Sequence, residues 1–128
     1  MFVFIAATTM LLASCSKENK LNKKLEGTWT LVSTTEGGVT VTAASQNVTS
    51  TMTFAKVEKE SGTYSSSYTY MGVTYTSSGT YTLTEDTQMT STQTAPSAGT
   101  PEVVTVVEYS KEELTIIDSD GTSYLYSK

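Results

Sequence analysis

The only cysteine of the chain, Cys15, is the residue whose chemistry is easiest to define. It follows an apolar stretch, residues 1–12, that contains no charged side chain, and it comes directly after the small residues Ala13 and Ser14. The stretch is shorter than the roughly 20 residues that a helix needs to cross a bilayer. A short apolar block that ends in small residues is typical of a secretory signal peptide. The thiol at its end is a nucleophile available for covalent modification.

The order Leu12, Ala13, Ser14, Cys15 resembles the bacterial lipobox. The resemblance implies that a diacylglyceryl group is attached to the Cys15 sulfur and that residues 1–14 are removed as a signal peptide. The freed amine of Cys15 then receives a further acyl chain such as palmitate. Two or three chains make a firm anchor, because each buried CH₂ contributes about 0.8 kcal/mol and one chain alone is marginal. We therefore expect a lipoprotein of a Gram-negative cell envelope. It is anchored to the outer membrane, on either the periplasmic face or the surface face.

The segment that follows, SKENKLNKK over residues 16–24, carries four of the eight lysines of the chain. Its composition predicts a polar tether, either solvated or in contact with anionic headgroups. The expected organisation is a signal peptide over residues 1–14, the lipidated cysteine and its tether over residues 15–24, and one domain over residues 25–128.

The residue types that are missing exclude many chemistries. The chain has no His, every basic residue is Lys, and the net charge is −5. Without imidazole, histidine-based acid–base catalysis and Ser-His-Asp triads are excluded, and zinc or copper sites lack their usual ligands. The negative charge also disfavours nucleic acid, which requires a basic protein surface. We therefore expect a protein that is not an enzyme, with no metal and no cofactor.

An acidic cluster near the C-terminus, Asp118-Ser119-Asp120-Gly121, has the appearance of the start of a calcium-binding loop. Such a loop requires an acidic residue six positions after the glycine, and Ser127 occupies that position. Asp-Gly between two alternating apolar runs is instead a strong sign of a β-hairpin. The cluster therefore predicts a turn between the last two strands.

The composition and the apolar periodicity together predict an all-β protein. The chain contains 26 Thr and 17 Ser, and Thr, Val and Tyr favour strands over helices. Alternating apolar residues indicate about eight strands joined mainly by short turns. The sequence predicts a single antiparallel up-and-down β-barrel, in which residues 26–33 pair with residues 122–127, because closure removes exposed strand edges. An open β-sandwich is the alternative.

Gly27 and Trp29 form a Gly-x-Trp motif that resembles the first strand of the lipocalin superfamily. The chain is most similar to the lipocalin-like domains of bacterial lipoproteins, which place this motif soon after the lipidated cysteine and finish with a hairpin such as LTIIDSDGTSYLYSK. The resemblance implies an antiparallel calyx with Trp29 at its closed end and a ligand entrance at the other. It also implies a basic residue, usually Arg, packed over the tryptophan, and Lys128 is the substitute available here.

Tyr68, Tyr75 and Tyr81 are the candidate ligand-binding residues, because each is in phase with the apolar positions of its strand. The alternative is that the tyrosines fill a small barrel. Without Arg or His, a buried anion would find little compensation for its lost hydration, so the expected ligand is small, apolar or amphipathic, and uncharged or cationic. The alternative function is a non-catalytic interaction or structural lipoprotein of the cell envelope, with a filled barrel and an unknown protein partner.

Replacing the modified residue tests the anchor directly. We expect Cys15→Ala to remain an uncleaved precursor and to incorporate no fatty acid, because the acyl acceptor is gone. Metabolic labelling with a fatty acid, followed by electrophoresis of the membrane fraction, measures both effects. Ser16→Ala is the matched control and should be processed and labelled normally; labelling of Cys15→Ala would contradict the prediction.

Overall fold

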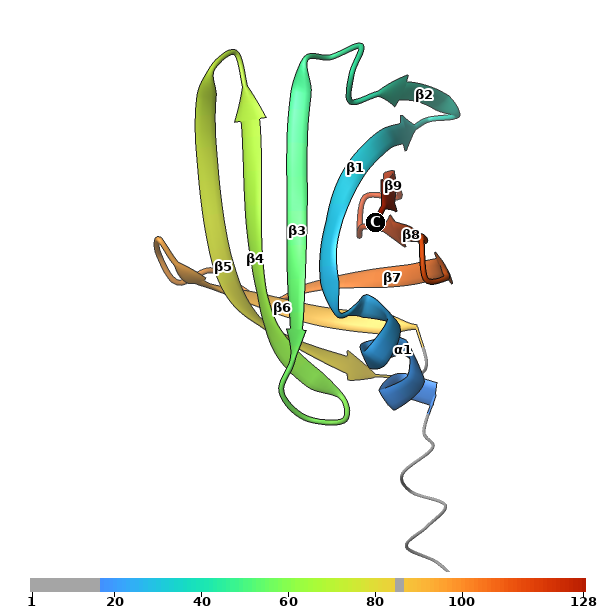
Figure 1. Ribbon diagram of the computed structural model, residues 1–128, viewed down its shortest axis with the longest axis vertical. Helices are drawn as coiled ribbons and strands as arrows, with labels where there is room; N and C mark the ends of the chain where they lie inside the picture. The colour runs from blue at the N-terminus through green and yellow to red at the C-terminus, as the bar shows by residue number, and fades with distance from the viewer. Residues whose placement is uncertain (1–16, 85–86) are drawn as a thin grey trace, which may run out of the picture.

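The computed structural model describes residues 17–84 and 87–128 (Figure 1). The expected signal peptide, Cys15 and the turn expected at residues 85–86 lie outside the described residues. One helix precedes nine strands, with these bounds: α1 (Lys17–Leu25), β1 (Gly27–Glu36), β2 (Val39–Thr42), β3 (Val48–Lys56), β4 (Ser61–Tyr70), β5 (Val73–Thr84), β6 (Gln88–Ala95), β7 (Glu102–Tyr109), β8 (Glu113–Ile117) and β9 (Ser123–Ser127).

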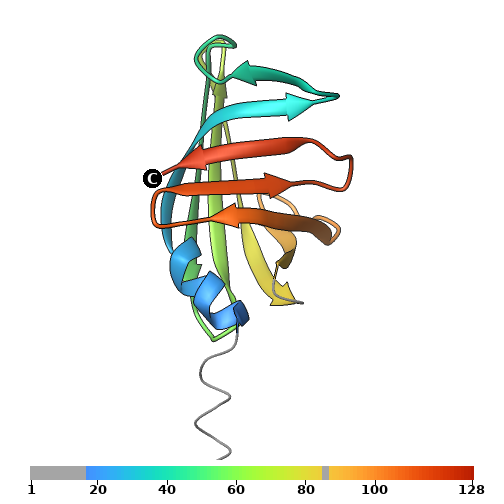
Figure 2. The same ribbon diagram turned by 90° about the vertical axis from the view of Figure 1, so that its right-hand side faces the viewer.

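The strands form one antiparallel sheet that closes on itself. β1 and β3 to β9 pair in sequence order, and β1 also pairs with β9, so that the ring is complete. The short strand β2 pairs with the far half of β1 and lies outside the ring order. In Figures 1 and 2 the long strands β3, β4 and β5 run nearly at right angles to β7, β8 and β9. The predicted up-and-down barrel and the pairing of its first and last strands are confirmed, and the open β-sandwich is excluded.

The register of the long β4–β5 hairpin determines which side chains face the interior. Its pairing is uninterrupted from Ser61↔Thr82 to Tyr70↔Val73. The two-residue turn at Met71 and Gly72 has positive φ angles of 52° and 77°. These are the conformations of a type I′ turn, which suits the twist of paired strands. Because side chains alternate along a strand, the phase of buried Tyr81 also places Tyr75 and Ser77 on the inner face.

One end of the barrel is filled by large side chains. Trp29, Phe54 and Tyr81 are almost completely buried there, and the rings of Phe54 and Tyr81 meet edge to face with centroids 5.4 Å apart. Gly62 permits this packing, because a Cβ at that position would lie 2.6 Å from the hydroxyl of Tyr81. The prediction that side chains fill the barrel is therefore correct for this closed end.

The segment predicted to be a polar tether is helical in the structure. Residues 17–24 belong to α1, which covers the closed end of the barrel (Figure 1). The helix buries Leu21 and Leu25 completely, and the two leucines share a face because they are four residues apart. The expectation of a solvated spacer over residues 17–24 is wrong, since the helix supplies apolar surface that the ring of strands leaves uncovered.

Asn22 fixes the helix to the barrel by hydrogen bonds. Its buried side-chain amide donates to the main-chain oxygens of Glu58, Lys59 and Ser61, at 2.9, 3.3 and 3.1 Å. Its carbonyl oxygen accepts a hydrogen bond of 2.5 Å from the hydroxyl of Tyr81. A buried amide must be paired in this way, because an unsatisfied polar group costs roughly 1–3 kcal/mol.

Trp29 is the centre of the closed end, as the Gly-x-Trp motif implies. Its indole nitrogen donates a 2.7 Å hydrogen bond to the main-chain oxygen of Leu25, at the end of α1. The Lys128 ammonium lies 4.7 Å from the Trp29 ring and occupies the place of the expected basic residue. Gly27 has a φ of 122°, and a Cβ there would lie 2.6 Å from the Lys128 side chain. The glycine of the motif therefore gives Lys128 room to reach the ring.

Removing the indole should destabilise the domain strongly. We expect Trp29→Ala to lower the free energy of unfolding by about 3–5 kcal/mol, the usual loss for a deleted buried aromatic side chain. Urea unfolding followed by circular dichroism measures this loss. Val57→Ala is the control, because Val57 is 68% exposed and should contribute less than about 0.5 kcal/mol. A loss below about 1 kcal/mol for Trp29→Ala would show that the ring is peripheral.

Candidate functional site

The interior of the barrel contains a cavity of about 290 Å³ beyond the packed closed end. It exists because the inner face carries small side chains at mid-height, where Ser66 and Ser77 lie opposite each other and share a 2.6 Å hydrogen bond. Its walls combine apolar, hydroxyl and carboxylate side chains: Met52, Phe54, Tyr64, Ser66, Ser77, Met89, Ser91, Gln93, Glu102, Val104, Ile116, Asp118, Tyr124 and Tyr126. We call it the inner cavity.

A second cavity of about 330 Å³ lies towards the open end, and we call it the mouth cavity. β2 and the turn after it form one wall, through Val41, Thr42, Ala43 and Gln46. Tyr68 of β4 contributes to the lining as well. Tyr124 and Tyr126 of β9 line both cavities. Each volume is near the lower end of the range for ligand pockets, about 300 Å³, and the shared tyrosines make the two cavities neighbours.

The ionisable groups of the inner cavity are carboxylates and phenols. Asp118 accepts a 2.9 Å hydrogen bond from the hydroxyl of Tyr124, and its other oxygen accepts from the main-chain nitrogens of Asp120 and Thr122. The Asp118–Gly121 cluster is thus a hairpin turn, as predicted. No lysine lines either cavity within residues 17–84 and 87–128. The chemistry of the walls therefore suits hydrogen-bond donors and positive charge.

Burial and nearby carboxylates keep the cavity tyrosines neutral. Burial, the hydrogen bond to Asp118 and the charge of that carboxylate raise the pKa of Tyr124 to about 12. Burial and the charge of Glu102 also raise the pKa of Tyr64. Burial raises the pKa of Tyr126 to about 12. These hydroxyls can both donate and accept hydrogen bonds at neutral pH.

The structure separates the three tyrosines that the sequence suggested as ligand contacts. Tyr68 and Tyr75 lie directly opposite each other on β4 and β5, at the open end, and are 43% and 63% exposed. Tyr81 is 1% exposed and hydrogen-bonds to Asn22 at the closed end. Tyr81 lines neither cavity and is part of the packed closed end. Tyr68 lines the mouth cavity, whereas Tyr75 lines neither cavity and is exposed at the open end. Ligand contact at these two residues stays a prediction, and the geometry assigns Tyr81 to the fold.

Exposed apolar side chains lie in two segments at the open end, and we call them together the apolar rim. Its residues come from β2 and from the β4–β5 hairpin, and all are substantially exposed: Val39, Val41, Tyr68, Tyr70, Met71, Val73 and Tyr75. Exposed apolar patches of this kind mark binding surfaces more often than scattered single residues do. The rim extends the apolar lining of the mouth cavity towards solvent.

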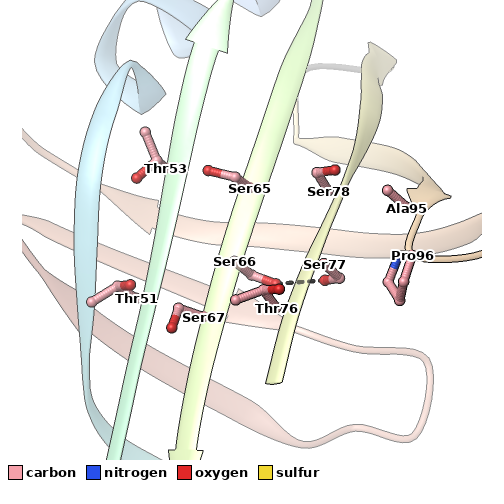
Figure 3. Close-up of a pocket in the computed structure, with 10 residues that line it drawn as sticks. All are labelled: Thr51, Thr53, Ser65, Ser66, Ser67, Thr76, Ser77, Ser78, Ala95 and Pro96. Atoms are coloured by element: carbon pink, nitrogen blue, oxygen red, sulfur yellow. Dashed lines mark hydrogen bonds between the residues drawn. The ribbon is translucent and has the colours of Figure 1, made fainter. Parts of the chain in front are cut away.

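A larger hollow of about 420 Å³ lies on the outer side of β3, β4 and β5, beside Pro96 (Figure 3). Most of its residues, such as Thr51, Ser65 and Thr76, are in the opposite strand phase from those of the inner cavity. Its lining consists of serines and threonines together with Ala95 and Pro96, and it lies outside the ring of strands. We therefore regard the inner and mouth cavities, and not this hollow, as the candidate site.

Two further findings concern the described residues alone. No helix among them is long and apolar enough to pass through a bilayer. No group of three or more Asp, Glu, His or Cys side chains among them could hold a metal ion.

Sequence reasoning missed the two carboxylates of the inner cavity. Glu102 and Asp118 lie at the start of β7 and just after β8, where acidic residues ordinarily indicate turns. The position of Tyr124 in the cavity wall could be recognised from the sequence, because Tyr124 alternates with Tyr126 in the last strand. Both side chains face inward. Only the closure of β9 against β1 brings them next to Met52 and Tyr64.

The buried phenols predict a loss of stability at alkaline pH. The pKa values of Tyr81, Tyr124 and Tyr126 in the folded protein are about 12, above the ordinary value of 10.0, so the fold favours the neutral forms. Their contribution is complete below pH 10 and is lost as the pH rises towards about 12. Urea unfolding at several pH values should show this decline. The decline should be smaller in Tyr126→Phe and unchanged in Tyr75→Phe, whose ring is 63% exposed; equal declines in all three proteins would contradict it.

Comparison with solved structures supports the same architecture. A lipocalin-like protein from Bacteroides uniformis aligns with a TM-score of 0.64 and 18% identity, over 82% of this chain and 98% of that one. The redesigned β-barrel mFAP1, bound to DFHBI, aligns with a TM-score of 0.54 and 20% identity, over 84% and 97%. EF1p2_mFAP2b, also bound to DFHBI, aligns with a TM-score of 0.56 and 15% identity, over 88% and 99%.

No curated protein matches the sequence. The family model for the lipocalin-like domain, in contrast, matches residues 25–116, from the end of α1 to β8. This match covers more than half of the chain and includes the Gly-x-Trp motif at the closed end. The chain therefore belongs to the lipocalin-like domain family.

Proposed function

We propose that this protein is a lipid-anchored, non-catalytic binding protein of the cell envelope that holds a small amphipathic ligand in its calyx. The observation that carries the proposal is the inner cavity of about 290 Å³, which lies inside the ring of strands and adjoins the mouth cavity. A barrel of this size can be filled by its own side chains. Here serines occupy the inner face at mid-height and leave that volume open.

The walls favour a particular kind of ligand. Met52, Met89 and Val104 offer apolar surface to one part of a molecule. The carboxylates of Glu102 and Asp118 offer acceptors to another part. A buried carboxylate or phosphate of a ligand would face these acids without a lysine to compensate for its lost hydration. The proposed ligand is therefore uncharged or cationic.

Two of the similar structures support the use of such a barrel for small molecules, since both are bound to DFHBI. Their identity to this chain, 20% and 15%, supports the shared fold and not a shared ligand. The ligand of this protein must be sought from its own cavity walls.

Anchoring through acyl chains on Cys15 completes the proposal. It is supported by the lipobox-like order of residues 12–15. An anchor at this position would hold the protein at a membrane of a Gram-negative envelope, and its proposed site is the outer membrane. The ligand would then be one that meets that surface.

A second candidate function rests on the apolar rim. Met71 is 79% exposed, Val39 66% and Tyr75 63%, and all three belong to the rim. Such a patch also suits a protein partner. In that case the barrel would be a structural or interaction module, and the cavities would remain without a ligand.

Filling the inner cavity distinguishes the two functions. Ser77→Phe places a ring into the inner cavity, whereas Thr76→Phe on the neighbouring outward-facing position leaves it open. We expect quenching of intrinsic fluorescence by at least one member of a panel of sterols, quinones, fatty acids and oligosaccharides. Ser77→Phe should weaken that binding by at least about tenfold, equivalent to about 1.4 kcal/mol.

Native mass spectrometry of the purified protein provides an independent readout, because a co-purified small molecule adds a discrete mass. Thr76→Phe should bind as the unaltered chain does. Equal binding by both variants would place the ligand outside the inner cavity. Tight binding of a fatty acid with its carboxylate buried would contradict the proposed ligand class. Binding by no member of the panel would favour the protein-partner function.

A further inference from the structure

The lysines of this acidic protein are gathered at the closed end of the barrel. α1 and the chain that adjoins it, namely the end of β3, the β3–β4 connection and the C-terminus, contain seven of the eight: Lys17, Lys20, Lys23, Lys24, Lys56, Lys59 and Lys128. Acidic residues adjoin this surface too, namely Glu18, Glu26, Glu58, Glu60 and Glu112, whose main-chain oxygen accepts a 2.9 Å hydrogen bond from the main-chain nitrogen of Lys128. The rest of the sequence contains one lysine, Lys111, and eight acidic residues. The positive charge is concentrated on α1, which carries four lysines and one glutamate, although the net charge of the chain is −5.

The helix presents its lysines away from the barrel. Leu21, Asn22 and Leu25 occupy the buried side of α1. Lys20 and Lys23 are exposed. Lys24 is also exposed, and its ammonium lies 5.2 Å from the ring of Tyr109. The outer face of the helix is thus a basic surface, and we call α1 together with Lys59 the basic cap.

The basic cap is held rigidly. Asn22 bonds to the β3–β4 connection and to Tyr81, and Lys56 donates a 2.7 Å hydrogen bond to Asn19. At the other end of the helix, Lys128 donates hydrogen bonds to the main-chain oxygens of Lys24 and Glu26, and Trp29 donates to Leu25. The direction of the helix relative to the barrel is therefore fixed by contacts at both of its ends.

Cys15 is only two residues before the first residue of α1. Two peptide units span at most about 7 Å. Acyl chains on Cys15 would therefore enter a bilayer close to the basic cap. A long flexible tether would permit many orientations, whereas so short a connection to a fixed helix restricts them.

We propose that the basic cap is a membrane-facing surface that binds anionic lipid headgroups and orients the calyx with its mouth away from the bilayer. The occupant is a lipid surface because the charge is complementary and because the proposed anchor is adjacent. Each lysine close to an anionic surface contributes about 1 kcal/mol, within a Debye length of about 8–10 Å. The inference rests on the proposed function only for the anchor; the charged surface itself is independent of acylation.

Vesicle binding by a chain that starts at Ser16 tests this surface without acyl chains and without a calyx ligand. Such a chain retains α1 and every strand of the closed ring, and circular dichroism verifies its fold. We expect it to co-sediment with phosphatidylcholine vesicles that contain phosphatidylglycerol, and not with vesicles of phosphatidylcholine alone. Raising the salt concentration should release it, because screening weakens the attraction between exposed charges.

Charge variants locate the surface. Lys20→Gln/Lys23→Gln should reduce partitioning into the anionic vesicles by about 10- to 30-fold. Val39→Glu/Thr76→Glu changes the net charge by the same amount at exposed positions of β2 and of the part of β5 next to the β4–β5 turn, and it should reduce partitioning by less than about threefold. Equal losses in both variants would show a general charge effect and overturn the proposal, as would equal binding to neutral and anionic vesicles.

Hydrogen exchange of the vesicle-bound chain measures orientation. We expect slower exchange in α1 and the β3–β4 connection and unchanged exchange at the β4–β5 turn; protection at the turn alone would overturn the orientation. Failure of these experiments would leave fatty-acid labelling at Cys15 and ligand binding unaffected. Conversely, absence of labelling at Cys15 would reject the anchor while the vesicle result remained.

Discussion

The closure of the sheet through β1 is the constraint on which the rest of the structure depends. The first half of β1, Gly27 to Thr30, pairs with β3, and the second half pairs with β9 on one side and β2 on the other. A bulge at Val32, between Leu31 and Ser33, lets the strand change direction where these pairings meet. Because β9 is bonded to both β8 and β1, the ring has no free edge within the described strands, and its inner face becomes an enclosed volume.

The sizes of the inward-facing side chains divide this volume into a filled half and an open half. Trp29, Phe54 and Tyr81 occupy the closed end, where α1 completes the packing. Further along β4 and β5 the inner positions are Ser66 and Ser77, which leave the inner cavity. The interpretation of the tyrosines as filling is therefore correct for the closed end, whereas their interpretation as ligand contacts stays a prediction for the open half. Position along the strand decides between them, since all of these side chains share one face.

Much of the fold could be predicted from the sequence because strand faces follow a period of two and the turns have distinctive residues. Asp120-Gly121 lies in a tight turn at the predicted position, between β8 and β9. The helix α1 was missed because lysines and asparagines dominate its sequence; only the spacing of Leu21 and Leu25 indicated an apolar face. The inner cavity was harder still to predict. Its polar wall joins Glu102 to Tyr64 and Tyr124, residues far apart in sequence that become neighbours only when the ring closes.

The hairpin that closes the ring also supplies part of the candidate site, and this links the stability of the fold to its proposed function. Tyr126 and Tyr124 pair with Leu31 and Thr34 of β1 and with Leu114 and Ile116 of β8, while their rings line both cavities. Asp118 holds the turn of the hairpin through main-chain nitrogens and at the same time binds the hydroxyl of Tyr124. A ligand that contacts these side chains would interact with the strands that keep the barrel closed. Because such a ligand binds only the folded state, its binding free energy adds to the stability of the closed ring.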